Sequence, residues 1–308
     1  QCLLVSADDR PLTMVVRESE RAEIEADTLA DEVVGWGGSE PGDPVDIFSR
    51  AVRDRGLLTS RVGMEVPAYY LHPHHYVRVK ELLGGALVAE PGNLVHALKL
   101  VKSPQELSYV RDAARTADAA MGVFARSLRV GRTEIEVAGD VHHALLGPHG
   151  GLAASTMNLV SGERSSFSHG APTERRLASG DFGNIEFGAV RRRYTSTIGR
   201  QFVMGRPTPR MTELYTVVRE ASEAMRAEIR DGVPAIVPHE AAKKVIATAG
   251  LDRYRIHTSG YGIAPGFPPS WGEPTNMFGG SKDVLRAGMV LSIEPPVFIP
   301  EERLGARL

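Results

Sequence analysis

The chain has 308 residues, of which 42% are hydrophobic and 24% charged, and its formal net charge is −2. This length fits two domains of ordinary size, and a charge so close to neutral favours neither nucleic acid nor an anionic membrane as a partner. The apolar runs are short and interrupted, which predicts no membrane-spanning helix. The single cysteine, Cys2, excludes an internal disulfide framework, so we expect a cytoplasmic protein.

The first part of the chain, residues 1–99, alternates strand and helix signals. Residues 12–16 predict a strand, the acidic stretch 18–31 a helix or exposed connection, 44–55 a helix and 61–65 a strand. This rhythm predicts a small α/β domain. The chain opens on an apolar run and ends directly after a strand-like stretch, so we expect both domains to be truncated, one at its start and one at its end.

A second domain is expected over residues 100–308. Ser103, Pro104 and Glu106 supply an N-cap, a proline at the first helical position and a capping-box glutamate, and apolar residues follow at helical spacing as far as Leu128. Thr133 with its own glutamate three residues later caps a shorter second helix. The boundary between the domains therefore falls between residues 99 and 104.

This order of helices then repeats. A long helix is predicted from Thr212 to a stop at Gly232, and a shorter one over about residues 238–249. Each pair of helices precedes a glycine-rich, β-prone segment, residues 158–205 in the first half and 254–299 in the second. Two α-α-β-β halves indicate an internal pseudo-repeat with a site where the sheets meet, although two unrelated α/β lobes would also give such segments.

Four polar side chains stand in apolar, strand-like surroundings: His169, Glu186, His257 and Glu294. A carboxylate in such a strand costs several kcal/mol unless it is paired or protonated. One such glutamate would most simply form a buried ion pair with an arginine, and a lone histidine is more often a core residue than a catalytic one. Two glutamates in matching strands of two halves favour a functional site.

Several motifs carry a resemblance to the creatinase/prolidase/methionine-aminopeptidase family. They are the stretch from Lys102 to Glu106, His169 ahead of Gly180-Asp181, the strand Ile185 to Ala189, the strand Tyr194 to Phe202, and Leu291 to Pro295. Their order and spacing over residues 99–308 are those of the family. The resemblance implies a creatinase-type N-terminal α/β domain, a C-terminal pita-bread catalytic domain and a homodimer.

The departures from the family pattern concern its two-metal site. The resemblance places Glu186 where the first metal-binding aspartate would be, Thr197 at the second aspartate and Tyr261 at the metal-binding histidine. Glu294 is kept, and the last glutamate would lie just beyond Leu308. Threonine and tyrosine are poor substitutes in a dinuclear site, so we expect no metal and no cofactor.

Two metal-independent branches of the family show similar substitutions. The chain resembles creatinase in its glutamate at the first aspartate position and its Gly-Tyr-Gly motif. It resembles ectoine hydrolase in the run Arg192-Arg193-Tyr194 and in the loop from Pro268 to Glu273. The segment around His169 is more similar to the dipeptidases.

The resemblance therefore implies a metal-independent hydrolase that cleaves a C–N bond of a small nitrogenous solute, ectoine-like or creatine-like. His169 would shuttle the proton, since imidazole titrates near neutrality, and Glu186 and Glu294 would bind the substrate or one of them would attack it. The substrate-binding residues would be Tyr261, His257, Trp271, Phe267 and Arg200. Simple packing is an equally good interpretation of Trp271.

Two other functions stay open. One is a metal-dependent Xaa-Pro dipeptidase or aminopeptidase, and the other is a catalytically inactive binding protein on the same fold. The retention of His169 and Glu294 argues mildly against the inactive protein. In each enzymatic reading the partner is a small-molecule substrate.

Overall fold

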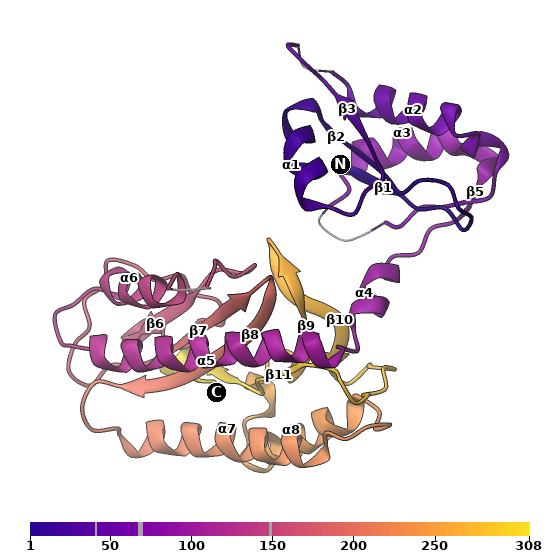
Figure 1. The fold of residues 1–308 in the computed structure, drawn as a ribbon. Coiled ribbons are helices and arrows are strands. Elements are labelled where there is room, and N and C mark those ends of the chain that lie inside the picture. Colours follow the sequence, from indigo (N-terminus) through magenta and orange to yellow (C-terminus); the bar gives the residue numbers. More distant parts are fainter. Residues whose placement is uncertain (41, 67–69, 148–149) are drawn as a thin grey trace. The chain divides into compact units, whose positions relative to one another are not determined.

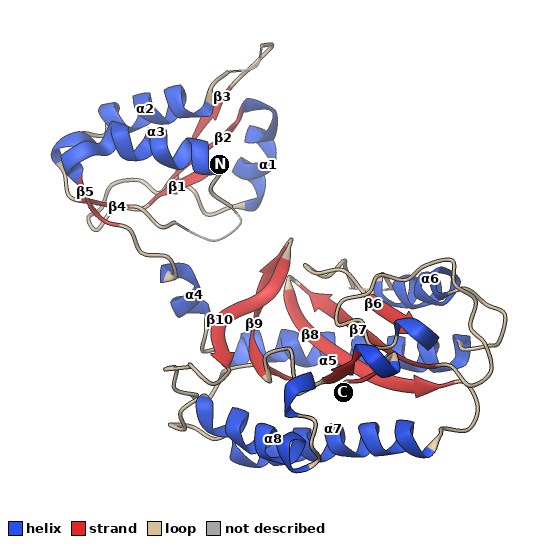
Figure 2. Cartoon of the chain, turned by 180° about the vertical axis from the view of Figure 1, so that it is seen from behind, coloured by secondary structure: helices blue, strands red, loops and turns tan. Residues whose placement is uncertain are grey.

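The computed structural model describes residues 1–40, 42–66, 70–147 and 150–308. It divides into two units, Gln1–Leu94 and Val95–Leu308, and the helix α4 (Leu94–Lys99) lies at the division. Figures 1 and 2 show the chain from opposite sides. Nowhere in the described ranges is a helix both long enough and apolar enough to cross a bilayer.

The N-terminal unit is a small α/β domain. In its main sheet β2 pairs with β1 in antiparallel and with β3 in parallel orientation, and β4 pairs with β5 separately. Val45, Val52, Val79 and Leu83 form the core between the helices. The strands are β1 (Cys2–Leu4), β2 (Thr13–Arg17), β3 (Glu32–Trp36), β4 (Val62–Gly63) and β5 (Leu87–Ala89). The helices are α1 (Arg21–Asp27), α2 (Pro44–Asp54), α3 (Pro73–Leu83) and the 3-10 turns η1 (Glu18–Glu20), η2 (Leu57–Thr59) and η3 (Gly84–Ala86).

The C-terminal unit contains the two expected pairs of helices, α5 (Pro104–Ser127) with α6 (Glu134–Leu145), and α7 (Pro209–Glu228) with α8 (Ile236–Thr248). Ser103 and Thr133 form full capping boxes at α5 and α6. The α7 helix begins earlier than Thr212, because Thr208 accepts a hydrogen bond from the Met211 amide and Pro209 takes the first helical position.

The strands of this unit form one antiparallel sheet and one hairpin. The sheet order is β10-β9-β8-β7-β6, with β11 also paired to β9, and the hairpin is β12-β13. The two halves join where Tyr194 on β8 pairs with Pro265 on β9. The strands are β6 (Asn158–Ser161), β7 (Phe182–Arg191), β8 (Tyr194–Val203), β9 (Gly260–Phe267), β10 (Ser270–Met277), β11 (Leu291–Ile293), β12 (Val297–Ile299) and β13 (Leu304–Ala306). The remaining 3-10 turns are η4 (Gly162–Arg164), η5 (Asp252–Tyr254) and η6 (Pro300–Glu302).

The long helices α5 and α7 pack against the strands of this unit. α5 packs on β7 and β8, and it lies in front of them in Figure 1 and behind them in Figure 2. One core joins α5 and α6 to β6 and β7, and a second joins α7 and α8 to the β12-β13 hairpin. The C-terminal residues lie between these two layers, beside β7.

Candidate active site

Two buried glutamates from different halves share one arginine. Glu186 lies on β7 opposite Gly199 of β8, and Glu294 directly follows β11. Nη2 of Arg307 lies 2.8 Å from Oε2 of Glu186 and 2.6 Å from Oε2 of Glu294. All three side chains are buried, and Asn158 on β6 also donates to Oε2 of Glu186 at 2.8 Å. The two carboxylates thus meet at a single cation.

This cluster leaves one polar atom without a partner. Oε1 of Glu294 is buried and has no hydrogen-bond partner among the described residues. Burial first, and the neighbouring Glu186 carboxylate second, raise the pKa of Glu294. Two carboxylates and one guanidinium carry a net charge of −1 when all are ionised. The cluster can therefore accept either a proton or a cationic substrate group at Oε1 of Glu294.

His169 lies beside the cluster, in a loop rather than in the strand that its apolar neighbours indicated. The guanidinium of Arg307 donates from Nη1 to the carbonyl of Ser168 at 2.8 Å, which holds the next residue, His169, near the charges of Arg307 and Glu186. The imidazole of His169 reaches solvent, and its ring lies 5.4 Å from that of His257. Partial burial and the charge of Arg307 lower the pKa of His169, so the neutral form that can accept a proton is favoured.

Tyr261 faces the two carboxylates from β9. Its hydroxyl accepts a hydrogen bond of 3.0 Å from the indole Nε1 of Trp271. Burial, and then Glu294 and Glu186, raise the pKa of Tyr261, so the phenol keeps its proton and can donate it to an oxyanion. Trp271 itself is buried against Gly188, where any Cβ would lie 3.0 Å from the indole ring.

A cavity of about 300 Å³ surrounds the shared arginine. Glu186, Glu294 and Arg307 line it, with Thr197 and Arg200 of β8 on its wall. This volume is at the lower end of the range for small-molecule sites, so the cavity fits a compact substrate.

A second, more open cavity of about 440 Å³ adjoins His257. Its basic lining comes from His239, Lys243 and Arg255, of which Lys243 lies 3.6 Å from Glu240 and Arg255 lies 3.2 Å from an aspartate. His257 lines this cavity and also contacts the ring of His169. The ring contact between His257 and His169 therefore connects this basic cavity to the histidine beside the glutamates.

The structure brings together five of the eight candidate side chains: His169, Glu186, Tyr261, His257 and Glu294. Trp271 contacts the site indirectly, through its hydrogen bond to the Tyr261 hydroxyl and its packing against Gly188. Arg200 lines the cavity but donates its hydrogen bond to the Gly199 carbonyl, and no contact with a glutamate is recorded for it.

Phe267 does not form a wall of the site with Trp271, because its ring is exposed and stacks with the guanidinium of Arg193 at 4.9 Å. Sequence reasoning missed Arg307 and Asn158. A charged residue ending the apolar run Leu304-Gly305-Ala306 was a signal of the same kind as the two buried glutamates.

The described residues do not fit a pair of divalent ions. No group of three or more histidine, cysteine, aspartate or glutamate side chains in these ranges is arranged to hold a metal. Oε2 of Glu186 and Oε2 of Glu294 are both paired with Arg307. Thr197 and Tyr261 supply only hydroxyls. Hard divalent ions need several carboxylate or imidazole donors at once, which this arrangement does not offer.

Comparison with known proteins identifies relatives of this chain. Residues 108–308 match the family model described as "Metallopeptidase family M24". The chain is 27% identical over 298 residues to the uncharacterized peptidase YqhT of Bacillus subtilis, covering 97% of this chain and 80% of that one. It is 27% identical over 303 residues to an Xaa-Pro dipeptidase of Lactobacillus helveticus, covering 97% and 79%.

Solved structures share the fold. The prolidase of Pyrococcus horikoshii matches with a TM-score of 0.85 at 24% identity, over 99% of this chain and 82% of that one. The dipeptidase PepE of Mycobacterium ulcerans matches with a TM-score of 0.83 at 26% identity, over 99% and 79%. The expected pita-bread fold of mixed α/β class is thereby confirmed.

These relatives overturn the expected activity. A metal-independent hydrolase of an ectoine-like or creatine-like solute was expected, but the relatives are named Xaa-Pro dipeptidases and peptidases, and the matching family is one of metallopeptidases. The expectation failed because substitutions at ligand positions report on the metal site and say little about the substrate.

Proposed function

Because this chain belongs to metallopeptidase family M24, we propose that it hydrolyses the peptide C–N bond of short Xaa-Pro peptides. The observation that carries the proposal is the meeting of Glu186, Glu294 and Arg307 in a small cavity beside His169. The names of relatives over nearly the whole chain support the substrate class. The small volume of the cavity supports a dipeptide rather than a long chain.

The proposed roles follow from the charges. Oε1 of Glu294, buried and unpaired, would accept the α-ammonium group of the N-terminal residue. Tyr261 would donate its hydroxyl proton in a hydrogen bond to the carbonyl oxygen as that oxygen becomes negative. Arg307 holds both glutamates in place while these groups bind.

His169 would carry the proton. A water oxygen adds to the scissile carbonyl carbon while neutral His169 takes a proton from that water, and the imidazolium then returns it to the leaving nitrogen. The C–N bond breaks, and the products are a carboxylic acid and a secondary amine, the imino nitrogen of proline. The lowered pKa of His169 supports the first step, since it keeps the imidazole neutral at pH 7.

The basic cavity supports a substrate with a free C-terminus. Lys243 and Arg255, which line the cavity beside His257, would attract the carboxylate of the C-terminal residue. A blocked C-terminus would lose this attraction. The proposal therefore favours a dipeptidase over an enzyme that trims longer peptides.

The test is release of free proline from Ala-Pro, Leu-Pro and Phe-Pro, measured by chromatography with added Mn²⁺ and with chelator. Parallel reactions use the amide Ala-Pro-NH₂ and the His169→Ala variant. We expect turnover of the free dipeptides, slower turnover of the amide and little with the variant. Absence of proline release from every dipeptide under both conditions contradicts the proposal. A homodimer stays a prediction, to be tested by light scattering.

A further inference from the structure

The loop that carries His169 has no secondary structure of its own. Between η4 and β7, over residues 165–181, every residue is described and none belongs to a named helix or strand. Two backbone contacts flank the histidine: Arg307 donates to the Ser168 carbonyl at 2.8 Å, and the Leu159 amide donates to the Gly170 carbonyl at 2.9 Å. The remainder of the loop is fixed by further backbone hydrogen bonds, such as that from the Ile135 amide to the Thr173 carbonyl at 3.1 Å, and by side chains.

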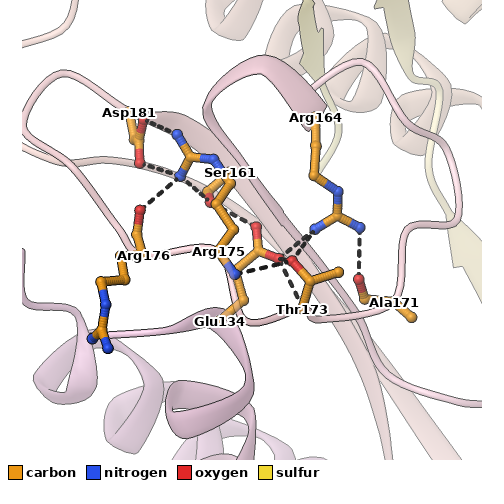
Figure 3. A network of polar contacts seen from close by, with 8 residues as sticks. All are labelled: Glu134, Ser161, Arg164, Ala171, Thr173, Arg175, Arg176 and Asp181. Carbon is orange, nitrogen blue, oxygen red and sulfur yellow. Dashed lines mark hydrogen bonds and ion pairs between the residues drawn. The ribbon is translucent and has the colours of Figure 1, made fainter. Parts of the chain in front are cut away.

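Those side chains converge on Glu134, as Figure 3 shows. Oε1 of Glu134 accepts from the Ser161 hydroxyl at 2.6 Å. Oε2 accepts from the guanidinium of Arg164, from the Thr173 amide at 3.0 Å and from the Thr173 hydroxyl at 2.8 Å. Arg164 also donates to the Ala171 carbonyl at 2.7 Å. One carboxylate thus binds the loop on both sides of His169.

Glu134 is a rigid anchor. It is the first residue of α6, directly after the N-cap Thr133, and its side chain is fully buried. A carboxylate in the first turn of a helix is stabilised by the helix dipole. The helix in turn is held in the core by Val137 and Val141, which are also fully buried.

A neighbouring ion pair extends the same network. Arg175 bonds to both carboxylate oxygens of Asp181 at 2.6 and 2.8 Å and donates to the Ser161 hydroxyl at 2.8 Å. The Glu134 amide donates to the Arg175 carbonyl at 3.0 Å. Backbone and side-chain contacts therefore tie the start of α6 to the loop along its length (Figure 3).

The carboxylate lies outside the reaction site. Glu134 does not line the cavity around Arg307, and its recorded contacts are with Ser161, Arg164, Thr173 and the backbone. Arg164 and Thr173 lie five residues before and four residues after His169. Any influence on the reaction therefore passes through the position of the loop.

We propose that Glu134 is a positioning residue that holds the His169 imidazole at the distance from the scissile bond that proton transfer needs. The inference rests on the proposed role of His169. Four donors converge on the two oxygens of Glu134, and a glutamine offers only one oxygen to receive them. Glu134→Gln therefore turns one acceptor into a donor that faces other donors, and the loop shifts.

The experiment compares Glu134→Gln with Asp140→Asn, both in the full chain. Asp140 lies on the same helix, and its carboxylate pairs with Arg132 and Ser127 instead of with Arg164 or Thr173. We expect Glu134→Gln to lower kcat about 10-fold with KM changed less than about 2-fold, since small misplacements of a reacting group cost rate. Asp140→Asn should leave both constants unchanged.

Hydrogen exchange supplies a readout that needs no turnover. We expect faster amide exchange over residues 165–173 in Glu134→Gln, and wild-type exchange there in Asp140→Asn. Unchanged exchange in this segment overturns the inference, whether or not the parent cleaves Xaa-Pro dipeptides. If the parent is active, an unchanged kcat in Glu134→Gln also overturns it. An inactive parent with altered exchange contradicts the proposed function and the role of Glu134 in the reaction alike.

A second pair of variants keeps the test independent of the charge. Thr173→Val removes the hydroxyl that bonds to Glu134 but keeps the amide, whereas Thr173→Ser keeps both donors. We expect Thr173→Val to lower kcat about 3-fold and Thr173→Ser to restore it, as one neutral hydrogen bond would. Equal kcat values for the two variants contradict the positioning role.

Discussion

Two clusters in the C-terminal unit both pair buried carboxylates with arginine, and they differ in how fully their polar atoms are used. Around Glu134 both carboxylate oxygens accept hydrogen bonds, from Ser161, Arg164 and Thr173. Around Arg307 two carboxylates share one guanidinium nitrogen, and Oε1 of Glu294 has no hydrogen-bond partner in the part of the chain that the structure describes. One cluster is complete within the protein and the other leaves an acceptor available.

The difference separates a structural from a functional use of the same chemistry. A buried network in which every polar atom has a hydrogen-bond partner fixes one conformation, so its removal lowers the stability of the fold. A buried acceptor without a partner costs stability in the free protein and is useful only when a ligand completes it. Removing the Glu134 carboxylate should therefore lower mainly the stability of the protein. Neutralising the Glu294 carboxylate should lower mainly its activity.

The largest expected effect is on the stability of the Glu134→Ala variant. Removing the buried carboxylate leaves Arg164 and the Thr173 amide, both partly buried, without their acceptor, which should lower the free energy of unfolding by about 3 kcal/mol. Urea denaturation followed by circular dichroism measures it. Glu163→Ala, which removes an exposed pair with Arg303, should change it by less than about 0.5 kcal/mol. If Glu134→Ala lowers the free energy of unfolding by less than about 1 kcal/mol, the structural role of the Glu134 cluster is contradicted.

The next effect is on the activity of Glu294→Gln. The amide keeps an oxygen for Arg307 but no longer offers a negative charge to the substrate, so kcat/KM should fall about 100-fold on an Xaa-Pro dipeptide. The free energy of unfolding should stay within about 1 kcal/mol of the parent, because the buried charge is also removed. Glu302→Gln, at an exposed pair with Arg210, is the control for both measurements. Equal activity in the two variants would contradict the assignment.

A smaller effect is expected at Trp271. Trp271→Phe keeps an aromatic ring over Gly188 but removes the indole N–H that donates to Tyr261. The loss of about one hydrogen bond should cost about 1 kcal/mol, seen as a roughly 5-fold lower kcat if Tyr261 loses its orientation. Steady-state kinetics on the same dipeptide measure it. A change in KM alone would instead indicate that Tyr261 contributes to substrate binding and not to the chemical step.

The smallest expected effect is a dependence of stability on pH at His239. Burial, and then Arg255, lower the pKa of this histidine, which also bonds to the Ser259 hydroxyl at 2.9 Å. As the pH falls below about 6.5, the unfolded chain binds a proton that the folded chain does not. Stability therefore falls with pH until the folded pKa is passed, by at most about 1.4 kcal/mol per pH unit.

Urea unfolding at about pH 7, about pH 6 and about pH 5 measures this slope. His239→Asn should flatten it, and His143→Asn, at an exposed imidazole on α6, should leave it as in the parent. A parent slope that His239→Asn does not change would contradict the assignment to His239.

Local sequence signals sufficed for much of the fold. The capping boxes at Ser103 and Thr133 fix the starts of α5 and α6 through contacts three residues apart, which a sequence displays directly. The α7 helix begins at Pro209, before the predicted start at Thr212, because Thr208 caps it and the proline takes its first position. Those two signals are also local and stand in the sequence.

The site was less accessible to sequence reasoning. Glu186 and Glu294 were identified because each interrupts an apolar strand, but their partner Arg307 lies 121 residues along the chain from Glu186. No local pattern encodes a contact over that separation. Phe267 was misplaced for a similar reason, because an apolar ring beside Trp271 in sequence turns to the surface at the end of β9.

The position of Arg307 has a consequence for how the enzyme is made. Arg307 bonds to Glu186, to Glu294 and to the carbonyl before His169, and so joins three segments that are synthesised at different times. Domains fold as their residues leave the ribosome, and this one can hold every helix described above before residue 307 has emerged. The two buried carboxylates, Glu186 and Glu294, therefore have no shared cation until those helices have all been synthesised.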